Sequence, residues 1–138
     1  MLGLDIGDKR IGVALGDPEG VLASQLTTIL RKEDEADLEA ILELARQHGV
    51  ERIVVGLPIS MDGSLGKQAE KVLTFSRSLA QRAEMPVDSW DERLSTVAAD
   101  RAMVEAGVKS AKKKARRDSL AAAIMLQAYL DRHRLSTR

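Results

Sequence analysis

The chain lacks cysteine and is poor in histidine and aromatic residues. Without cysteine there is no disulfide, no thiolate nucleophile and no zinc–thiolate site. Three aromatic residues, Phe75, Trp90 and Tyr129, are too few for the sheet surface on which many RNA-binding domains stack bases. Neither histidine, His48 or His133, accompanies a serine or aspartate motif, so we expect no hydrolase triad and no imidazole metal cluster.

Long apolar runs are also absent. No run approaches membrane-spanning length, and the first residues enter a predicted strand at once, so we expect neither a signal peptide nor an anchor. Hydrophobic residues make up 44% and charged residues 30% of the 138 positions, which is typical of a soluble globular protein. We therefore expect one domain over residues 1–138, in the cytoplasm.

The net charge is zero, but the charges are distributed unevenly. Residues 1–100 contain 18 acidic and 11 basic residues, whereas residues 101–138 contain 3 acidic and 10 basic residues. This asymmetry predicts an anionic partner for the C-terminal part. Two solvated faces that attract each other would be the structural alternative.

Hydrophobic periodicity and turn residues predict an α/β fold with a mixed five-stranded sheet flanked by helices. The first three strands should be antiparallel, and the last two should lie parallel because helices separate them. The expected strands span 2–6, 11–15, 23–30, 52–57 and 87–91. The expected helices span 34–48, 64–83 with a cap at Ser64, 96–106 after a cap at Ser95 or Thr96, and 116–132.

Carboxylates are the main candidates for catalysis. Asp5 lies within an apolar strand among glycines, which predicts a cation or metal beside it and space for a substrate phosphodiester. Asp91 and Glu92 end the last strand, where parallel sheets expose their ligand crevice, and Asp118 begins the last expected helix. Each acid alone could be structural, as a turn former, a partner of Arg93 or a helix N-terminal charge.

Convergence of these acids at one edge of the sheet would give them a common function. Converging carboxylates repel one another unless divalent cations bind between them, and all-oxygen ligation suits Mg²⁺ or Mn²⁺. Two such ions can activate a water and stabilise the leaving oxygen of a phosphodiester. The combination therefore predicts a metal site for phosphodiester hydrolysis.

Basic residues precede Asp118 in the expected connection between the last two helices. We expect a flexible loop that contacts phosphates flanking the scissile bond and makes binding salt-sensitive; a solvated surface loop is the alternative. Lys9 and Arg10 in the first hairpin would add phosphate contacts beside Asp5, and Arg93 is a further candidate. The basic run comprises Lys109, Lys112, Lys113, Lys114, Arg116 and Arg117.

Four segments together resemble the YqgF/RuvX family of ribonuclease H-like proteins over nearly the whole chain. The resemblance implies a ribonuclease H-like fold, divalent-metal nuclease chemistry and an acidic triad at Asp5, Glu92 and Asp118. Asp8 departs from the threonine that is more common in the first motif. The segments are 4–14 (LDIGDKRIGVA), 53–58 (IVVGLP) with 61–63 (MDG), 91–96 (DERLST), and Asp118 with the apolar helix to Leu130.

The resemblance leaves two substrates open, because such proteins are described as nucleases that mature the 5′ end of pre-16S rRNA or as Holliday-junction resolvases. A resolvase makes two coordinated cuts and would be a symmetric dimer, whereas trimming of precursor rRNA needs only a monomer. A non-catalytic nucleic-acid-binding module is a third hypothesis. An actin-like or sugar-kinase-type ATPase shares the first hairpin but requires two domains.

Overall fold

The computed structural model describes residues 1–95 and 111–136, with side chains over 1–95 and 114–133. A five-stranded sheet in the order β3-β2-β1-β4-β5 forms its centre. The antiparallel pairs are β1–β2 and β2–β3, and the parallel pairs are β1–β4 and β4–β5, which confirms the predicted mixed sheet. The strands are β1 (Leu2–Ile6), β2 (Arg10–Gly16), β3 (Ala23–Leu30), β4 (Ile53–Leu57) and β5 (Val87–Asp91).

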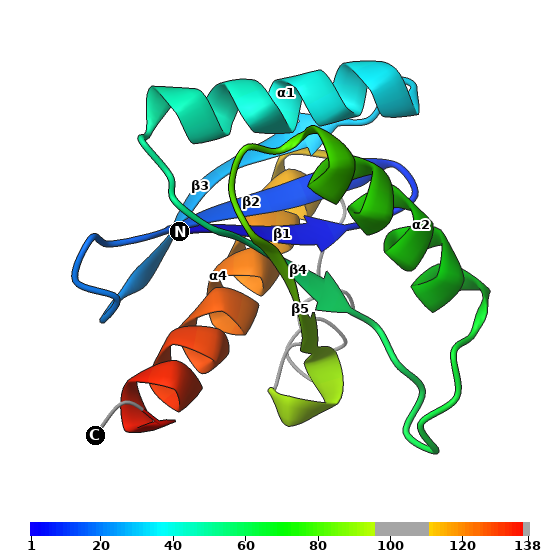
Figure 1. Cartoon of the computed structure of the whole chain (residues 1–138). Coiled ribbons are helices and arrows are strands. Elements are labelled where there is room, and N and C mark those ends of the chain that lie inside the picture. The colour runs from blue at the N-terminus through cyan, green and yellow to red at the C-terminus, as the bar shows by residue number, and fades with distance from the viewer. Residues whose placement is uncertain (96–110, 137–138) are drawn as a thin grey trace.

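Helices cover both faces of this sheet (Figure 1). α1 (Asp34–Gln47) and α2 (Lys67–Arg82) pack on one face, and the long α4 (Ala111–Ser136) crosses the other. A single 3₁₀ turn, η1 (Glu92–Leu94), follows β5 directly. In the part of the chain that is described, no helix combines the length and the apolar character that crossing a bilayer requires.

Two helix starts differ from the sequence prediction. The N-cap of α2 is Gly66, because the Ser64 hydroxyl instead donates to Asp62, 2.6 Å away. α4 begins at Ala111, so residues 111–117 are helical and the expected basic loop is wrong for them. Alanine, lysine and arginine favour helix, and no glycine or proline interrupts this segment. The expected helix over 96–106 and Lys109 lie outside the described residues.

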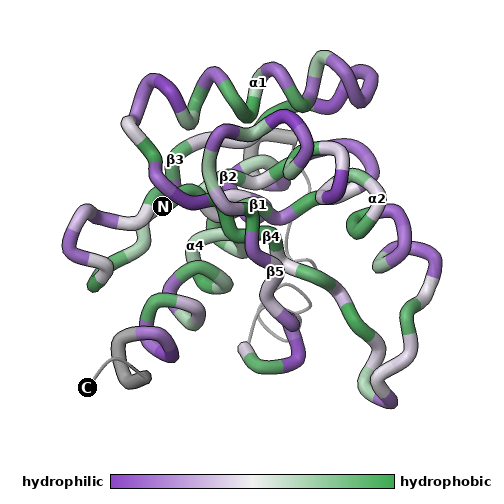
Figure 2. The backbone as a smooth tube through the Cα atoms, viewed as in Figure 1, coloured by the Kyte–Doolittle hydropathy of each residue, from purple (hydrophilic) through white to green (hydrophobic). Residues whose placement is uncertain are grey.

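Alternation along the strands produces two separate apolar layers. Leu2, Leu4 and Ile6 of β1 pack beneath α1 and α2, while Val54 of β4 and Trp90 of β5 pack against α4. Figure 2 shows the matching pattern on α1, where hydrophobic and hydrophilic stretches alternate along the helix as expected when one side meets the core. The sheet is therefore buried on both faces.

The face beneath α4 is lined by small residues, which lets the helix approach the strands closely. A Cβ at Gly3 would lie 2.9 Å from Cβ of Leu126, and one at Gly12 would lie 2.0 Å from the carbonyl oxygen of Asp118. Both distances are too short for real contacts, so α4 can rest here only because these residues are glycine. The expectation that glycines beside Asp5 leave room for substrate is thus wrong at Gly3 and Gly12.

The C-terminal half of α4 is joined to the sheet by polar contacts. The hydroxyl of Tyr129 donates to Oδ2 of Asp88, 2.7 Å away, and Arg52 forms an ion pair with the same carboxylate. The ring of His133 stacks on Tyr129 with 3.9 Å between centroids. These contacts fix the far end of the helix that carries Asp118.

Replacing Gly12 by alanine should destabilise the protein by about 3 kcal/mol, because a new methyl group would push α4 away from β2. Gly16→Ala is the matched control: it lies on the same strand and face, but its Cβ would meet atoms no closer than 3.5 Å. Urea denaturation of both variants measures the difference. Equal stability of the two variants would contradict the close packing of α4.

Tyr129 should titrate unusually late, because burial, followed by its hydrogen bond to Asp88, raises its pKa from 10.0 to about 12. A raised pKa means that folding favours the neutral phenol. This stabilisation is complete below pH 10 and is lost as the pH rises through about 12. Phenolate absorbance of this single tyrosine measures the midpoint. A midpoint near 10 in protein that circular dichroism shows to be folded would contradict the contact.

Candidate active site

Asp5 lies on the face of the sheet that α4 covers. Its neighbours Leu4 and Ile6 point into the core beneath α1 and α2, so alternation places Asp5 on the opposite face. The Cα partner of Asp5 on β2 is Gly12, and Asp5 is only 7% exposed. A carboxylate this deeply buried needs cations or hydrogen-bond donors around it.

Gly12 also determines the position of Asp118. Because the carbonyl of Asp118 lies directly over Gly12, this residue of α4 stands beside Asp5 across the β1–β2 pair. Asp118 is 8% exposed and is the eighth residue of α4, so the expectation that it begins the helix is wrong. A helix interior fixes its backbone more firmly than a frayed first turn would.

Glu92 approaches from the other side of β1. It is 7% exposed, and its Oε1 would lie 2.6 Å from a Cβ at Gly56 of β4. The carboxylate therefore rests on the bare backbone of β4. Leu4 pairs with Val55, so Asp5 and Gly56 are the next residues of these two parallel strands.

The three predicted acids thus lie side by side on one face of the sheet. Across neighbouring strands, Asp118 covers β2, Asp5 belongs to β1, and Glu92 covers β4. Each is less than a tenth exposed. Three buried carboxylates in this order repel one another, so the arrangement needs positive charge.

Arginine supplies positive charge at Asp118. Nε of Arg10 lies 2.6 Å from Oδ2 of Asp118, and Nη2 of Arg117 lies 3.4 Å from Oδ1. Arg10 and Gly12 are two residues apart on β2 and therefore share the face beneath α4. The sequence hypothesis missed this pairing, although the same alternation could have placed Arg10 on the face of Asp5.

The donor set agrees in kind with a divalent cation, because carboxylate oxygens are preferred ligands of Mg²⁺ and Mn²⁺. Its residues come from a strand, a strand end and a helix interior, each held by backbone packing. Within residues 1–95 and 114–133, no group of three or more His, Cys, Asp or Glu side chains is gathered tightly enough to hold a metal ion. An ion at Oδ2 of Asp118 would compete with Arg10.

Asp91, the alternative acid beside Glu92, is bound to Arg93. Its carboxylate accepts bonds from Nε and Nη2 of Arg93, the latter at 2.6 Å, and from the backbone N–H of the same residue. The hydrogen bond from Arg93 lowers the pKa of Asp91. Asp91 therefore orients Arg93, whose guanidinium also lies near Gly63 of the loop after β4.

The remaining basic candidates have different surroundings. Lys9, Lys114 and Arg116 are exposed, whereas the side chain of Arg117 is 9% exposed and faces Asp118. Lys112 and Lys113 belong to the first turn of α4, and their side chains are outside the described set. Oδ1 of Asp8, the unusual residue of the first hairpin, lies 3.6 Å from Nζ of Lys71 in α2.

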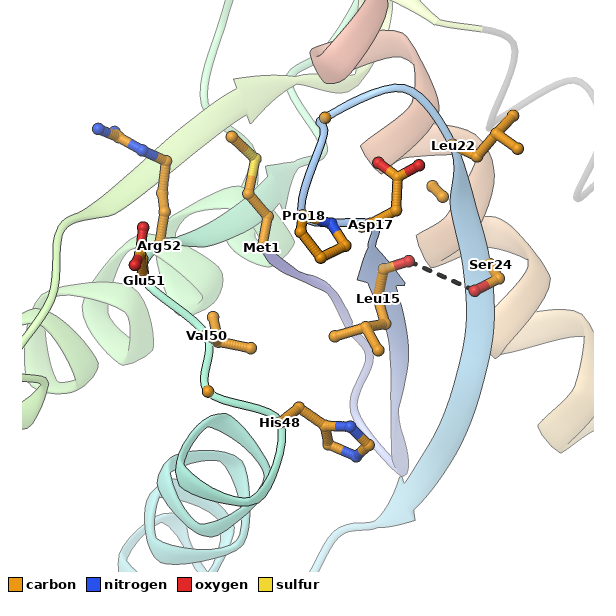
Figure 3. A pocket seen from close by; sticks show the side chains of 14 residues that line it. Met1, Leu15, Asp17, Pro18, Leu22, Ser24, His48, Val50, Glu51 and Arg52 are labelled. Atoms are coloured by element: carbon orange, nitrogen blue, oxygen red, sulfur yellow. Dashed lines mark hydrogen bonds between the residues drawn. The ribbon is translucent and has the colours of Figure 1, made fainter.

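A hollow of about 870 Å³ lies at the opposite end of the sheet (Figure 3). Met1, Leu15 and Val50 line it together with the polar residues His48 and Arg52. None of the predicted site residues contributes to its lining. Asp5, Glu92 and Asp118 therefore lie apart from this cavity.

Residues 1–132 match the family described as "RuvX: Holliday junction resolvase". The chain belongs to the RuvX family. Two relatives named "Putative pre-16S rRNA nuclease" support this membership: the protein of Clostridium kluyveri is 50% identical over 132 residues and that of Moorella thermoacetica is 52% identical over 132 residues. The alignments cover 96% of this chain and 96% and 94% of those proteins.

The fold of this RuvX-family chain is ribonuclease H-like, as the sequence resemblance implied. A solved structure described as "T. thermophilus RuvC in complex with Holliday junction substrate" superposes with a TM-score of 0.64 at 19% identity. The match covers 99% of this chain and 95% of the other. At 19% identity this likeness shows the fold alone. The assignment to nucleic-acid hydrolases rests on the family match.

Gly56→Ala should displace the Glu92 carboxylate and lower nucleic-acid cleavage by about 10- to 100-fold. The nearest atom is the end of the flexible Glu92 side chain, and Cγ of Met125 at 3.3 Å needs to move only slightly, so the free energy of unfolding should fall by less than about 1.5 kcal/mol. Gly66→Ala is the control, because its Cβ would meet nothing closer than 4.0 Å. Wild-type cleavage by Gly56→Ala would show that the position of Glu92 does not matter.

Proposed function

We propose that this protein is a divalent-metal-dependent endonuclease that hydrolyses phosphodiester bonds of nucleic acid. The observation that carries the proposal is that Asp5, Glu92 and Asp118 lie over three adjacent strands on one face of the sheet. Relatives about half identical in sequence and named as nucleases support it. We place the activity in the cytoplasm, in keeping with nucleic acid as substrate.

In this proposal, Asp5, Glu92 and Asp118 hold Mg²⁺ or Mn²⁺ through their carboxylate oxygens. Ions held there would supply activation of a water and stabilisation of the leaving oxygen of a phosphodiester. The positions of the acids follow from the fold. Asp5 belongs to β1, which lies between β2 and β4. Glu92 packs on the backbone at Gly56, and the backbone of Asp118 packs on Gly12. Burial of the acids also strengthens their attraction for cations.

Basic residues around the acids would hold the nucleic-acid backbone. The first turn of α4 contains no acidic residue, although a helix N-terminus favours acids. Phosphates bound there would offset the unfavourable charge of the helix start. We propose that this end of α4 and the residues near η1 and the first hairpin contact the substrate. These residues are Lys9, Arg10, Arg93, Lys112, Lys113, Lys114, Arg116 and Arg117.

We propose precursor 16S rRNA, near its 5′ end, as the substrate, because the relatives at about 50% identity carry that name. Branched DNA is the second candidate, because the matching family is described as a Holliday junction resolvase. The two candidates differ in assembly. Two coordinated cuts in a four-way junction call for a symmetric dimer, and a single cut in rRNA needs one monomer.

Asp5→Asn should reduce cleavage by at least about 100-fold while the protein stays folded, because asparagine keeps the shape but removes the charge that holds the ion. Asp17→Asn, at the opposite end of the sheet, is the control and should cleave as the wild type does. Gel assays with Mg²⁺ and with Mn²⁺ measure the rates. Equal rates for Asp5→Asn and the wild type would sink the proposal.

The same assay, run side by side on precursor rRNA and on a four-way DNA junction, decides between the substrates. We expect specific cuts in the RNA by a protein whose mass in solution is that of a monomer. Symmetric junction cuts by a dimer would overturn the rRNA assignment in favour of the resolvase. No cut in either substrate with either metal would favour a non-catalytic binding module.

A further inference from the structure

Arg10 holds the carboxylate that the proposed metal site requires. Its Nε donates to Oδ2 of Asp118 at 2.6 Å, and only 21% of the Arg10 side chain and 11% of the Asp118 side chain are exposed. The shielded position strengthens this ion pair relative to one at the surface. Its partners are 108 residues apart in sequence, so the contact depends on the docking of α4.

An arginine hydrogen-bonded to Oδ2 and a metal ion bound to the same atom compete with each other. The lone pair that faces the guanidinium accepts the N–H bond, and two cations so close together repel. Arg117 contacts the other oxygen, Oδ1, at 3.4 Å. The positive charge that faces Asp118 therefore comes from within the chain.

We infer that Arg10 is a displaceable counter-ion: it pairs with Asp118 as in this structure, yields Oδ2 when a divalent ion binds, and then becomes available to a substrate phosphate. This inference rests on the proposed metal site. A guanidinium fits a phosphate as well as a carboxylate. Because metal binding frees Arg10, metal and nucleic acid should each strengthen the binding of the other.

The cost of displacing Arg10 should weaken metal binding by the wild-type protein. Removing a charged hydrogen bond of this kind corresponds to about a tenfold change in affinity. Arg10→Gln should therefore bind Mn²⁺ about tenfold more tightly than the wild type in calorimetric titrations without nucleic acid. The same variant should melt at a lower temperature without metal and gain more in melting temperature from saturating Mn²⁺.

Lys9→Gln is the matched control, because Lys9 is the adjacent exposed cation of the same hairpin. Lys9→Gln tests whether the removal of any nearby positive charge improves metal binding. We expect its Mn²⁺ affinity to stay within about twofold of the wild-type value. In an Asp118→Asn background, the effect of Arg10→Gln on Mn²⁺ affinity should vanish. An Arg10→Gln affinity equal to or weaker than that of the wild type would overturn the inference, as would an equal gain in Lys9→Gln.

A measurement on the wild-type protein covers the case in which Arg10→Gln fails to fold. The N–H signal of Arg10 Nε, followed by nuclear magnetic resonance, should be protected from exchange without metal and lose that protection as Mg²⁺ is added. An unchanged signal at Mg²⁺ saturation would overturn the inference. Metal-driven release of Arg10 without cleavage of either substrate would support this inference and refute the nuclease; absence of metal binding would refute both.

Discussion

Contact between the backbones of α4 and β2 at Gly12 determines where the acidic side chains lie. A methyl group at this position would fall 2.0 Å from the carbonyl of Asp118, so a helix can lie here only over glycine. The contact brings Asp118 beside Asp5. It also requires that other positions beneath α4 and Glu92 carry no side chain. Gly3 beneath Leu126 and Gly56 beneath Glu92 meet this requirement.

Close packing has an electrostatic consequence. It removes three carboxylates from water in one place, and their repulsion has to be offset by cations. Arg10 and Arg117 contribute this charge at Asp118. The proposed divalent ions would take over that role, so stability and catalysis would depend on the same charges.

Much of the fold could be predicted because its signals are local. β1 and β3 and the start of α1 agree with the prediction, since alternation and helical periodicity are written in adjacent residues. The start of α4 could not be predicted correctly, because the basic run was interpreted as a loop although its residues favour helix.

The sequence predicted that the three acids converge, and the structure places them on one face of the sheet, but their contacts could not be predicted. The apolar strand around Asp5 and the strand end before Glu92 are local signals, whereas the support that Gly56 gives Glu92 and the bond from Arg10 to Asp118 depend on tertiary packing. Glycines near Asp5 were correctly expected to permit a close approach. The approaching group at Gly12 is a helix of the same chain, which local sequence does not reveal.

Anomalous diffraction from crystals of the protein grown with Mn²⁺ tests the central claim most directly. We expect Mn²⁺ density between the carboxylates of Asp5, Glu92 and Asp118, with Nε of Arg10 no longer bonded to Asp118. If crystals grown with saturating Mn²⁺ show no anomalous density at these carboxylates and the Arg10–Asp118 bond is intact, the proposed metal site is contradicted.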